Sequence, residues 1–444
     1  MLTKQENELL TRVGPGTPMG GLLRQYWHPV AAAAELEASP FRTKEVRVLC
    51  EDLVLYRDRS GQLGLIDRWC SHRRVNLAYG VVEQDGVRCQ YHGWKFDQTG
   101  ACTEQPFEET VHPDGRFKEK CGVAGYPTKE AGGLVFAYLG PQPAPEFPLW
   151  EPLAWDNVVR DIAITELPCN WLQCQENSVD PVHSEWLHGC FGDLMRTMEE
   201  TSGADKQTKD VMFRQSRVLR LKTLKIGFDV FEHGIVKRRI VEGMTEEDES
   251  WAVGHPIMFP NILLVGNQYS CTLQFRVPID DTRTFHVSLY TFRAAPGVPA
   301  PQQESVPVRY VQTFDEQGNW TNLEFTFNQD YMSWASQGPI AERNREKLGE
   351  SDKGIILFRR LIKQQLEALA AGRPPMNVFR NAAEASYVRL PLEHITYGVK
   401  NPRRPNYVPA EAGWSADRGL IEATLATWDQ HAPAPSDAAT TVLP

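Results

Sequence analysis

The chain has 444 residues, of which 41% are hydrophobic and 23% charged, with a formal net charge of −10 at pH 7. This length is sufficient for two or three domains, and the composition is that of an ordinary globular protein. The negative charge argues against nucleic acid or an anionic membrane as a partner. The amino-terminal MLTKQENELL lacks the apolar core of a signal peptide. No apolar run approaches the roughly 18 residues that span a bilayer. The nine cysteines lack the spacing of a disulfide framework, which predicts reduced thiols and a cytoplasmic location.

The first half of the chain predicts a helical extension followed by a small all-β domain. Residues 1–25 are expected to form a short helix and then a turn within residues 14–20, because the glycines there follow no strand as a nucleotide-binding loop requires. From about Thr43 to Leu139, short β-rich runs alternate with turn signals. The proline-rich segment GPQPAPEFPLWEP, residues 140–152, indicates a domain boundary.

The second half predicts a sheet, a long helix and a tail. Strand-like runs at 234–241, 262–265, 272–277 and 285–292 have no helix between them, which favours antiparallel pairing. Apolar residues then recur at helical spacing from Ile355 to Leu369, with Ser351 as the expected N-cap and Gly372 beyond the end. The alanine-, proline- and serine-rich residues 431–444 predict a disordered tail.

Two short segments each combine a cysteine with a histidine, Cys70-Ser71-His72 and Cys89-Gln90-Tyr91-His92. Two thiolates on one iron and two imidazoles on the other are the ligands of a Rieske-type [2Fe–2S] cluster. A structural zinc ion is the alternative, since two cysteines and two histidines also suit tetrahedral zinc. The single residue between Cys70 and His72 departs from the usual zinc spacings and favours the cluster.

A second histidine pair, His183 and His188, indicates a further metal site. Two histidines and one carboxylate bind Fe(II) in non-haem oxygenases and leave positions open for O₂. Residues five apart lie about 140° from each other on a straight α-helix. We therefore expect the backbone to bend between the two histidines, or His188 to lie beyond the helix end. Asp180, three residues before His183, is expected on the same helical face.

The segment 70–95, CSHRRVNLAYGVVEQDGVRCQYHGWK, resembles the cluster-binding core of the Rieske non-haem iron oxygenases. The amino-terminal and later segments resemble the α (oxygenase) subunits of the phthalate dioxygenase-like branch. This resemblance implies a [2Fe–2S] cluster held by Cys70, His72, Cys89 and His92, with Trp94 packed over it. Ser71 stands where many relatives have proline, which affects the stiffness of the loop and no ligand.

The resemblance extends to Asn177-x-x-Asp180-x-x-His183-x₄-His188, which matches the family pattern. It implies that His183 and His188 bind a mononuclear Fe(II). It also implies that Asp180 links this site to a cluster histidine of a neighbouring subunit, in a homotrimer or a multiple of trimers. For the third ligand, Asp330 follows a segment that resembles the family's carboxylate position. Asp352 is the rival, although a carboxylate there also suits the first turn of a helix.

The implied fold is α+β. Residues 26–150 are expected to form the Rieske domain. Residues 151–430 are expected to form a catalytic domain whose antiparallel sheet is flanked by helices, of the helix-grip type. Two further residue groups are candidates for the substrate pocket. Lys237, Arg238 and Arg239 alternate along a strand, so one or two of them can face inward, where a cation suits a substrate carboxylate; a solvated strand face is the alternative role and the more common one. His255 and His286 lie in strand-like runs and are candidates either for the pocket wall or for ordinary core histidines with satisfied hydrogen bonds.

The expected function is that of a terminal oxygenase component that uses O₂ and NADH-derived electrons to hydroxylate or O-demethylate an aromatic compound. The resemblance implies a carboxylated substrate. The segments at 104–109 and 253–256 carry a faint likeness to demethylases of lignin-derived biaryl acids. A separate NADH-dependent reductase, directly or through a ferredoxin, is expected to supply electrons, since the chain has no dinucleotide fingerprint. The alternative is a non-enzymatic Rieske electron carrier fused to a ligand-binding domain, which would have no use for the second histidine pair.

Overall fold

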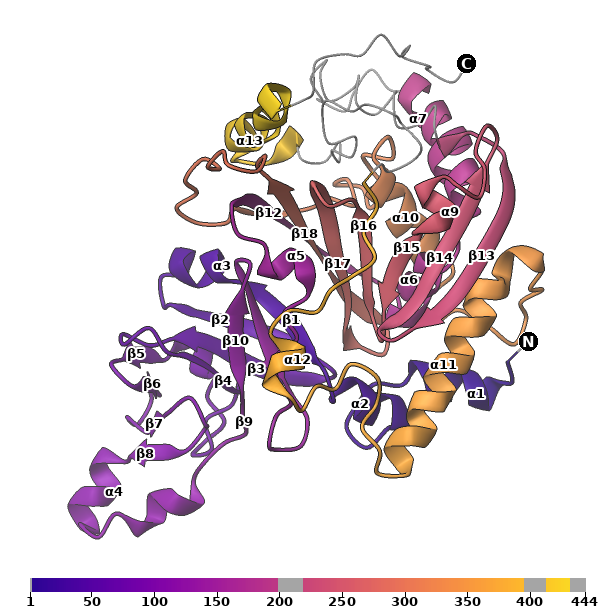
Figure 1. The fold of residues 1–444 in the computed structure, drawn as a ribbon. Helices are drawn as coiled ribbons and strands as arrows, with labels where there is room; N and C mark the ends of the chain where they lie inside the picture. Colours follow the sequence, from indigo (N-terminus) through magenta and orange to yellow (C-terminus); the bar gives the residue numbers. More distant parts are fainter. Residues whose placement is uncertain (1, 199–218, 395–412, 432–444) are drawn as a thin grey trace.

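The computed structural model describes residues 2–198, 219–394 and 413–431, and their elements form four sheets (Figure 1). Two four-stranded sheets make up the region around the Cys/His segments. The first has the order β2 (Thr43–Val48), β3 (Glu51–Arg57), β4 (Leu63–Asp67), β9 (Gly125–Tyr126). The second has the order β5 (Val81–Glu83), β6 (Gly86–Arg88), β7 (Lys95–Phe96), β8 (Cys102–Glu104). The prediction of a region of short strands is therefore confirmed.

A three-stranded sheet joins this region to the rest of the molecule. Its order is β1 (Trp27–Ala32), β11 (Leu134–Tyr138), β10 (Thr128–Ala131), all antiparallel. Short helices connect or follow the strands of these sheets: α3 (Ala33–Ala38), η1 (Leu77–Tyr79), α4 (Pro106–Val111), η2 (Arg116–Lys120) and α5 (Glu151–Ala154). In Figure 1, β5 to β8 and α4 lie at the lower left, far from the large sheet.

The large sheet has eight strands in the order β13, β14, β15, β16, β17, β18, β12, β19. Their bounds are β12 (Val158–Leu167), β13 (Thr223–Phe231), β14 (Gly234–Val241), β15 (His255–Met258), β16 (Ile262–Gly266), β17 (Ser270–Asp280), β18 (Arg283–Arg293) and β19 (Val308–Tyr310). Every pair is antiparallel except β12–β19, which is parallel. The four predicted strands are present as β14, β16, β17 and β18, so the expected antiparallel sheet is confirmed.

Both faces of the large sheet are covered, so its central strands are buried on either side. One face packs on the β1–β11 sheet, where the ring centroids of Phe136 and Phe275 lie 5.6 Å apart. Three helices cover the other face: α6 (Trp171–Ser178), α10 (Thr326–Ala335) and α11 (Lys353–Ala370). This second face is polar along β17 and β18, with Gln274, Arg276 and His286 all buried. Buried polar side chains are uncommon, so this face of the sheet is where a functional site is expected.

The remaining helices lie at the ends of the chain and around the large sheet: α1 (Lys4–Thr11), α2 (Pro18–Leu23), η3 (Ser184–Phe191), α7 (Gly192–Met198), α9 (Glu249–Ala252), η4 (Glu350–Asp352), α12 (Ala382–Ala385) and α13 (Arg418–His431). No helix of the described residues is long and apolar enough to cross a membrane. The predicted tail falls on residues 432–444, which lie outside the described residues, while His431 closes α13.

Two local expectations were wrong by a few residues. The turn predicted through residue 20 ends at Thr17, because Pro18 occupies the first position of α2, where its missing N–H is tolerated, and Thr17 caps that helix. The N-cap of α11 is Asp352 and not Ser351, because a short 3₁₀ turn precedes the helix. The end of α11 was predicted correctly, since Gly372 follows it with a φ of 70°.

Candidate metal centres

The two Cys/His segments fold into matching loops. In the first, the Cys70 amide donates to the Val75 carbonyl at 2.9 Å, and the Arg74 amide donates back to the Cys70 carbonyl at 2.9 Å. In the second, Cys89 and Trp94 make the equivalent bond at 2.8 Å, and Gly93 donates to Cys89 at 3.0 Å. The fifth residue of each loop, Arg74 or Gly93, has a positive φ that closes the turn. The same backbone geometry therefore presents one cysteine and one histidine from each loop.

The side chains of the loops sort by type. The His72 and His92 rings lie with centroids 4.4 Å apart, and Trp94 stacks on His72 at 4.5 Å, so the tryptophan contacts a histidine directly. Cys70 and Cys89 are buried, whereas His92 is exposed. A hydrogen bond from Cys70 is the main reason that the pKa of Cys89 falls to about 6. The loops thus hold a buried thiol pair and an imidazole pair in which His72 is partly buried and His92 is exposed.

This arrangement fits a two-iron cluster better than a single zinc ion. Tetrahedral zinc with bonds of 2.0–2.3 Å would bring its four ligand atoms to within roughly 4 Å of one another. Within the described parts of the chain, no three of these four side chains place their ligand atoms within 4.8 Å of one another. Ligands in two separated pairs are what a [2Fe–2S] cluster with two thiolates and two imidazoles requires. In addition, the buried His72 Nδ1 has no hydrogen-bond partner in the described structure, as expected of a ligand atom.

Ser71 tethers the first loop. Its hydroxyl donates to the Cys121 carbonyl at 2.5 Å, which links the loop to the segment after η2. The serine therefore restricts the loop by a hydrogen bond.

The second histidine pair lies on a π-helix. The helix η3 begins immediately after His183 and carries His188 within it. A π-helix joins residues five apart by its hydrogen bonds, so it places them one above the other on successive turns. The expected bend or helix end between the histidines is therefore wrong: the change of helical period brings both onto one face. Their ring centroids lie 5.0 Å apart.

Asp330 on α10 completes this group. Its Oδ1 lies 3.4 Å from His188 Nε2 and 3.8 Å from His183 Nε2, and one ligand atom of each residue lies within 4.8 Å of the others. Burial alone would raise the pKa of Asp330, but the charge and hydrogen bond of His188 hold it below its ordinary value. Burial likewise opposes the charged form of His188, and Asp330 raises its pKa. Two imidazoles and a carboxylate thus converge from separate elements, as a divalent metal requires.

Gln329 orients one of these histidines, and no sequence pattern singled it out. His188 Nδ1 lies 2.9 Å from Gln329 Oε1, and Gln329 Nε2 donates to the Leu323 carbonyl at 2.8 Å. The amide acceptor fixes the proton on Nδ1 and leaves Nε2 to face Asp330. Gly192 makes room for this side chain, because a Cβ at that position would lie 2.8 Å from Gln329 Nε2. Asn177 supports the group from α6, since its Nδ2 donates to Asp330 Oδ1 at 3.3 Å.

Asp180 lies beside His183 but not on a helix. Helix α6 ends at Ser178, and Asp180 Oδ1 accepts the amides of Val182 at 2.8 Å and His183 at 3.3 Å. The expectation of a shared helical face is thus wrong, and an Asx-type turn produces the proximity instead. Asp180 Oδ2 lies 3.6 Å from His183 Nδ1. Burial opposes ionisation, but the hydrogen bond and charge of His183 keep the pKa of Asp180 below its ordinary value.

A buried ion-pair network braces α6 just before this turn. Glu176 accepts from Arg343 Nη2 at 2.8 Å and from Arg359 Nε at 2.5 Å, and Arg359 also pairs with Glu346 at 2.8 Å. Arg343 further donates to Asn7 of α1 at 3.1 Å. The network ties α6 and α11 to the amino-terminal helix, so it fixes the start of the segment that carries Asp180 and His183.

The other candidates lie apart from the three-residue group. Asp352 accepts the Gly349 amide at 2.7 Å and so serves as a helix cap, as its sequence context allowed. His255 Nε2 faces Glu393 Oε1 at 3.1 Å, and the Tyr331 hydroxyl lies 3.1 Å from His286 Nδ1. Arg238 turns to the opposite side and pairs with Asp229 at 2.7 Å.

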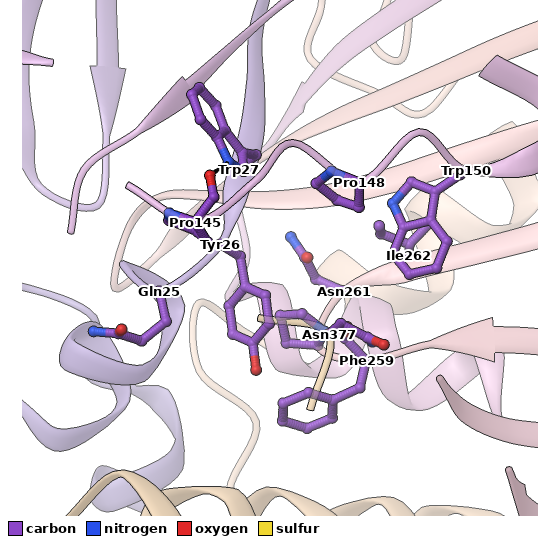
Figure 2. Close-up of a pocket in the computed structure, with 11 residues that line it drawn as sticks. Gln25, Tyr26, Trp27, Pro145, Pro148, Trp150, Phe259, Asn261, Ile262 and Asn377 are labelled. Carbon is purple, nitrogen blue, oxygen red and sulfur yellow. Dashed lines mark hydrogen bonds between the residues drawn. The ribbon is translucent and has the colours of Figure 1, made fainter. Parts of the chain in front are cut away.

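A cavity of about 20 Å³ lies where the amino-terminal segment meets the proline-rich stretch and the large sheet (Figure 2). Tyr26, Trp27 and Trp150 line it together with Phe259 and Asn377. This volume accommodates one or two water molecules and no aromatic substrate. None of the metal-site residues lines it, so we assign it no part in the chemistry.

Comparison with known proteins identifies the family. The Rieske [2Fe-2S] domain family matches residues 26–127, and the family described as "LigXa C-terminal domain like" matches residues 307–390. The chain is 43% identical to the 5,5'-dehydrodivanillate O-demethylase oxygenase subunit of Sphingobium sp., over 89% of this chain and 87% of that protein. It is 34% identical to the phthalate 4,5-dioxygenase oxygenase subunit of Pseudomonas putida, over 84% and 88%.

The structure of NdmA from Pseudomonas putida CBB5 shares the fold, with a TM-score of 0.53 at 19% identity over 85% of this chain and 98% of that chain. Members of the matched family carry a Rieske [2Fe–2S] cluster and a mononuclear iron, and the two ligand groups described above fit both. The chain therefore belongs to the α subunits of the Rieske non-haem iron oxygenases, and it is the oxygenase component of a multicomponent system.

Proposed function

We propose that His183, His188 and Asp330 bind the mononuclear Fe(II), and that Cys70, His72, Cys89 and His92 bind the cluster. The convergence of two imidazoles and one carboxylate within 4.8 Å carries this proposal. Such a triad occupies one face of Fe(II) and leaves the opposite positions to O₂. When bound, the iron supplies the activation of O₂, while Gln329 holds His188 in the required tautomer. An electron carrier would need none of these residues, which argues against the alternative of a carrier with a binding domain.

We propose further that Asp180 connects the iron site to the cluster of a neighbouring subunit in a homotrimer or a multiple of trimers. Figure 1 supports this proposal, because β5 to β8 lie on one side of the molecule and α6 and α10 lie on the other side. The sheet that contains β1 and β10 lies between them. A route within one chain would have to cross that layer. The proposal also assigns the electron supply to a separate NADH-dependent reductase, directly or through a ferredoxin. It places the protein in the cytoplasm, which the nine cysteines without disulfides support.

For the substrate, we propose an aromatic carboxylate that carries a methoxy group, with O-demethylation as the reaction. The relative with 43% identity is named an O-demethylase, and the relative with 34% identity is named a phthalate dioxygenase. Both printed names refer to aromatic acids, and the first favours demethylation over ring hydroxylation.

Turnover with a surrogate reductase, NADH and a panel of aromatic acids and aryl ethers tests the proposal. We expect formaldehyde release with a methoxylated acid, and loss of the product in His183→Ala while the electron paramagnetic resonance signal of the cluster persists. Formation of a cis-diol without formaldehyde would show that the reaction is dihydroxylation and not demethylation. Cluster reduction without any product would favour the electron carrier.

A further inference from the structure

Strand register places Lys237 and Arg276 on the same face of the large sheet, although three strand boundaries separate them. Direct pairs cross four strands in the order Ile235, Ile257, Leu263 and Gln274. Directly opposed residues share a face, and so do residues two apart on one strand. Lys237 follows Ile235 by two positions and Arg276 follows Gln274 by two. This is the face covered by α10, since the Arg276 guanidinium lies 5.7 Å from the centre of the Trp334 ring.

Arg276 is a buried cation that forms no ion pair within the described residues. It is 1% exposed, and its guanidinium donates to Gln274, with Nη2 at 2.7 Å from Oε1 and Nη1 at 3.4 Å from the carbonyl. Within the described parts of the chain, Arg276 Nε, Ser288 Oγ and His286 Nε2 are buried and have no hydrogen-bond partner. Such groups are rare in native structures, and a missing ligand is a recognised reason for them.

The charges around Lys237 show the same imbalance. In the described structure only burial and nearby charges act on its ammonium, with no hydrogen bond among these effects. Burial is the main reason that its pKa falls to about 8, and the positive charges of Arg239 and Arg276 contribute, against Asp180 and Asp330. Lys237 and Arg276 are thus two cations near the carboxylate of Asp330, and neither has an ion pair or a hydrogen bond to a carboxylate within the described residues. A bound Fe(II) would add positive charge beside them, which favours a nearby anion.

We infer that Lys237 and Arg276 bind the carboxylate of the substrate and make the enzyme select acids over neutral aromatic compounds. Arg276 offers Nε and an Nη group as a fork for two carboxylate oxygens, and Lys237 adds a point charge from β14. The inference rests on the proposed function, because both cations lie near Asp330 of the proposed iron site. A role as counter-ions of Asp180 and Asp330 alone is the competing explanation. It would make both cations necessary for iron binding and irrelevant to the charge of the ligand.

Equilibrium binding of 3-methoxybenzoate and of its methyl ester to the iron-loaded, cluster-containing protein tests the inference. The variants are Lys237→Met and Arg276→Met, which remove the charge and keep most of the volume. We expect the affinity for the acid to fall roughly 10- to 100-fold in each variant, as for the loss of one charge-assisted hydrogen bond. The affinity for the ester and the iron content should not change.

Lys225→Met and Arg283→Met are matched controls, because these cations are exposed and already paired with Glu246 and Asp280. We expect wild-type binding of both compounds in them. Equal losses for acid and ester, a loss of iron in either pocket variant, or no binding of the acid by the wild type would overturn the inference. If the acid binds in this charge-dependent way but no compound is turned over, the proposed function fails and the inference stands. If aryl ethers are turned over and turnover does not depend on Lys237 or Arg276, the inference fails and the proposed function stands.

Discussion

The substitution Gln329→Leu tests how the iron site is held together. The side chain of Gln329 joins His188 Nδ1 at 2.9 Å to the Leu323 carbonyl at 2.8 Å, and it is fully buried. Leucine fills a similar volume without an acceptor. The His188 N–H would then lose its partner, and the ring would no longer be fixed with Nε2 toward Asp330.

The magnitude follows from two independent considerations. A buried donor left without a partner costs about 1–3 kcal/mol. Loss of a residue that orients a metal-bound histidine weakens metal affinity by about 10–100-fold, or about 1.4–2.8 kcal/mol at 1.4 kcal/mol per factor of ten. The two ranges overlap, so we expect the Kd for the mononuclear Fe(II) to rise by about 10–100-fold.

Competition with a chelator measures this Kd, and acid-labile sulfide per chain reports the cluster independently. Gln337→Leu is the matched control, because that side chain is exposed and donates a long hydrogen bond of 3.4 Å to the Ser333 carbonyl. Gln329→Glu retains an acceptor and should recover most of the affinity. Wild-type iron affinity in Gln329→Leu, with cluster and circular dichroism intact, would refute the role assigned to this amide.

Three further predictions follow from buried charges. Glu176→Gln removes the carboxylate that pairs with buried Arg343 and leaves Arg359 with Glu346 alone, so urea unfolding should show a loss of about 3–5 kcal/mol, whereas Glu350→Gln at an exposed pair should cost less than about 1 kcal/mol. Asp180→Asn should keep both metal centres but slow product formation in single-turnover experiments with a pre-reduced cluster; unchanged rates would remove Asp180 from the electron route. Lys237 is charged below its pKa of about 8, so affinity for an aromatic acid should be full below pH 8 and decline as the pH rises through it. A flat profile that is unaltered in Lys237→Met would contradict this.

The sequence predicted the elements whose signals are local. Runs of strand-forming residues located β14, β16, β17 and β18, and Gly372 located the end of α11. Strands β12, β13 and β19 were not predicted, because their burial depends on partners distant in the chain. Strand β13 has an irregular burial pattern, and β19 contributes only three residues beside β12.

The candidate metal-site residues could be named from the sequence, whereas their geometry could not. The order of Cys70, His72, Cys89 and His92 needed only chemistry and resemblance. The helical period around His183 and His188 was not predictable, since α- and π-helices use the same residues and tertiary packing decides between them. Gln329 and Arg276 escaped notice because nothing in their local sequence distinguishes a buried polar side chain from an exposed one.

Iron and sulfide content per chain tests the central claim most directly. The wild-type protein should contain about three irons and two sulfides, as expected for one [2Fe–2S] cluster and one mononuclear Fe(II). Asp330→Asn should contain about two irons and make no product, whereas Asp352→Asn should retain about three and remain active. Two irons in the wild type after iron reconstitution, or three irons with full activity in Asp330→Asn, would contradict the account.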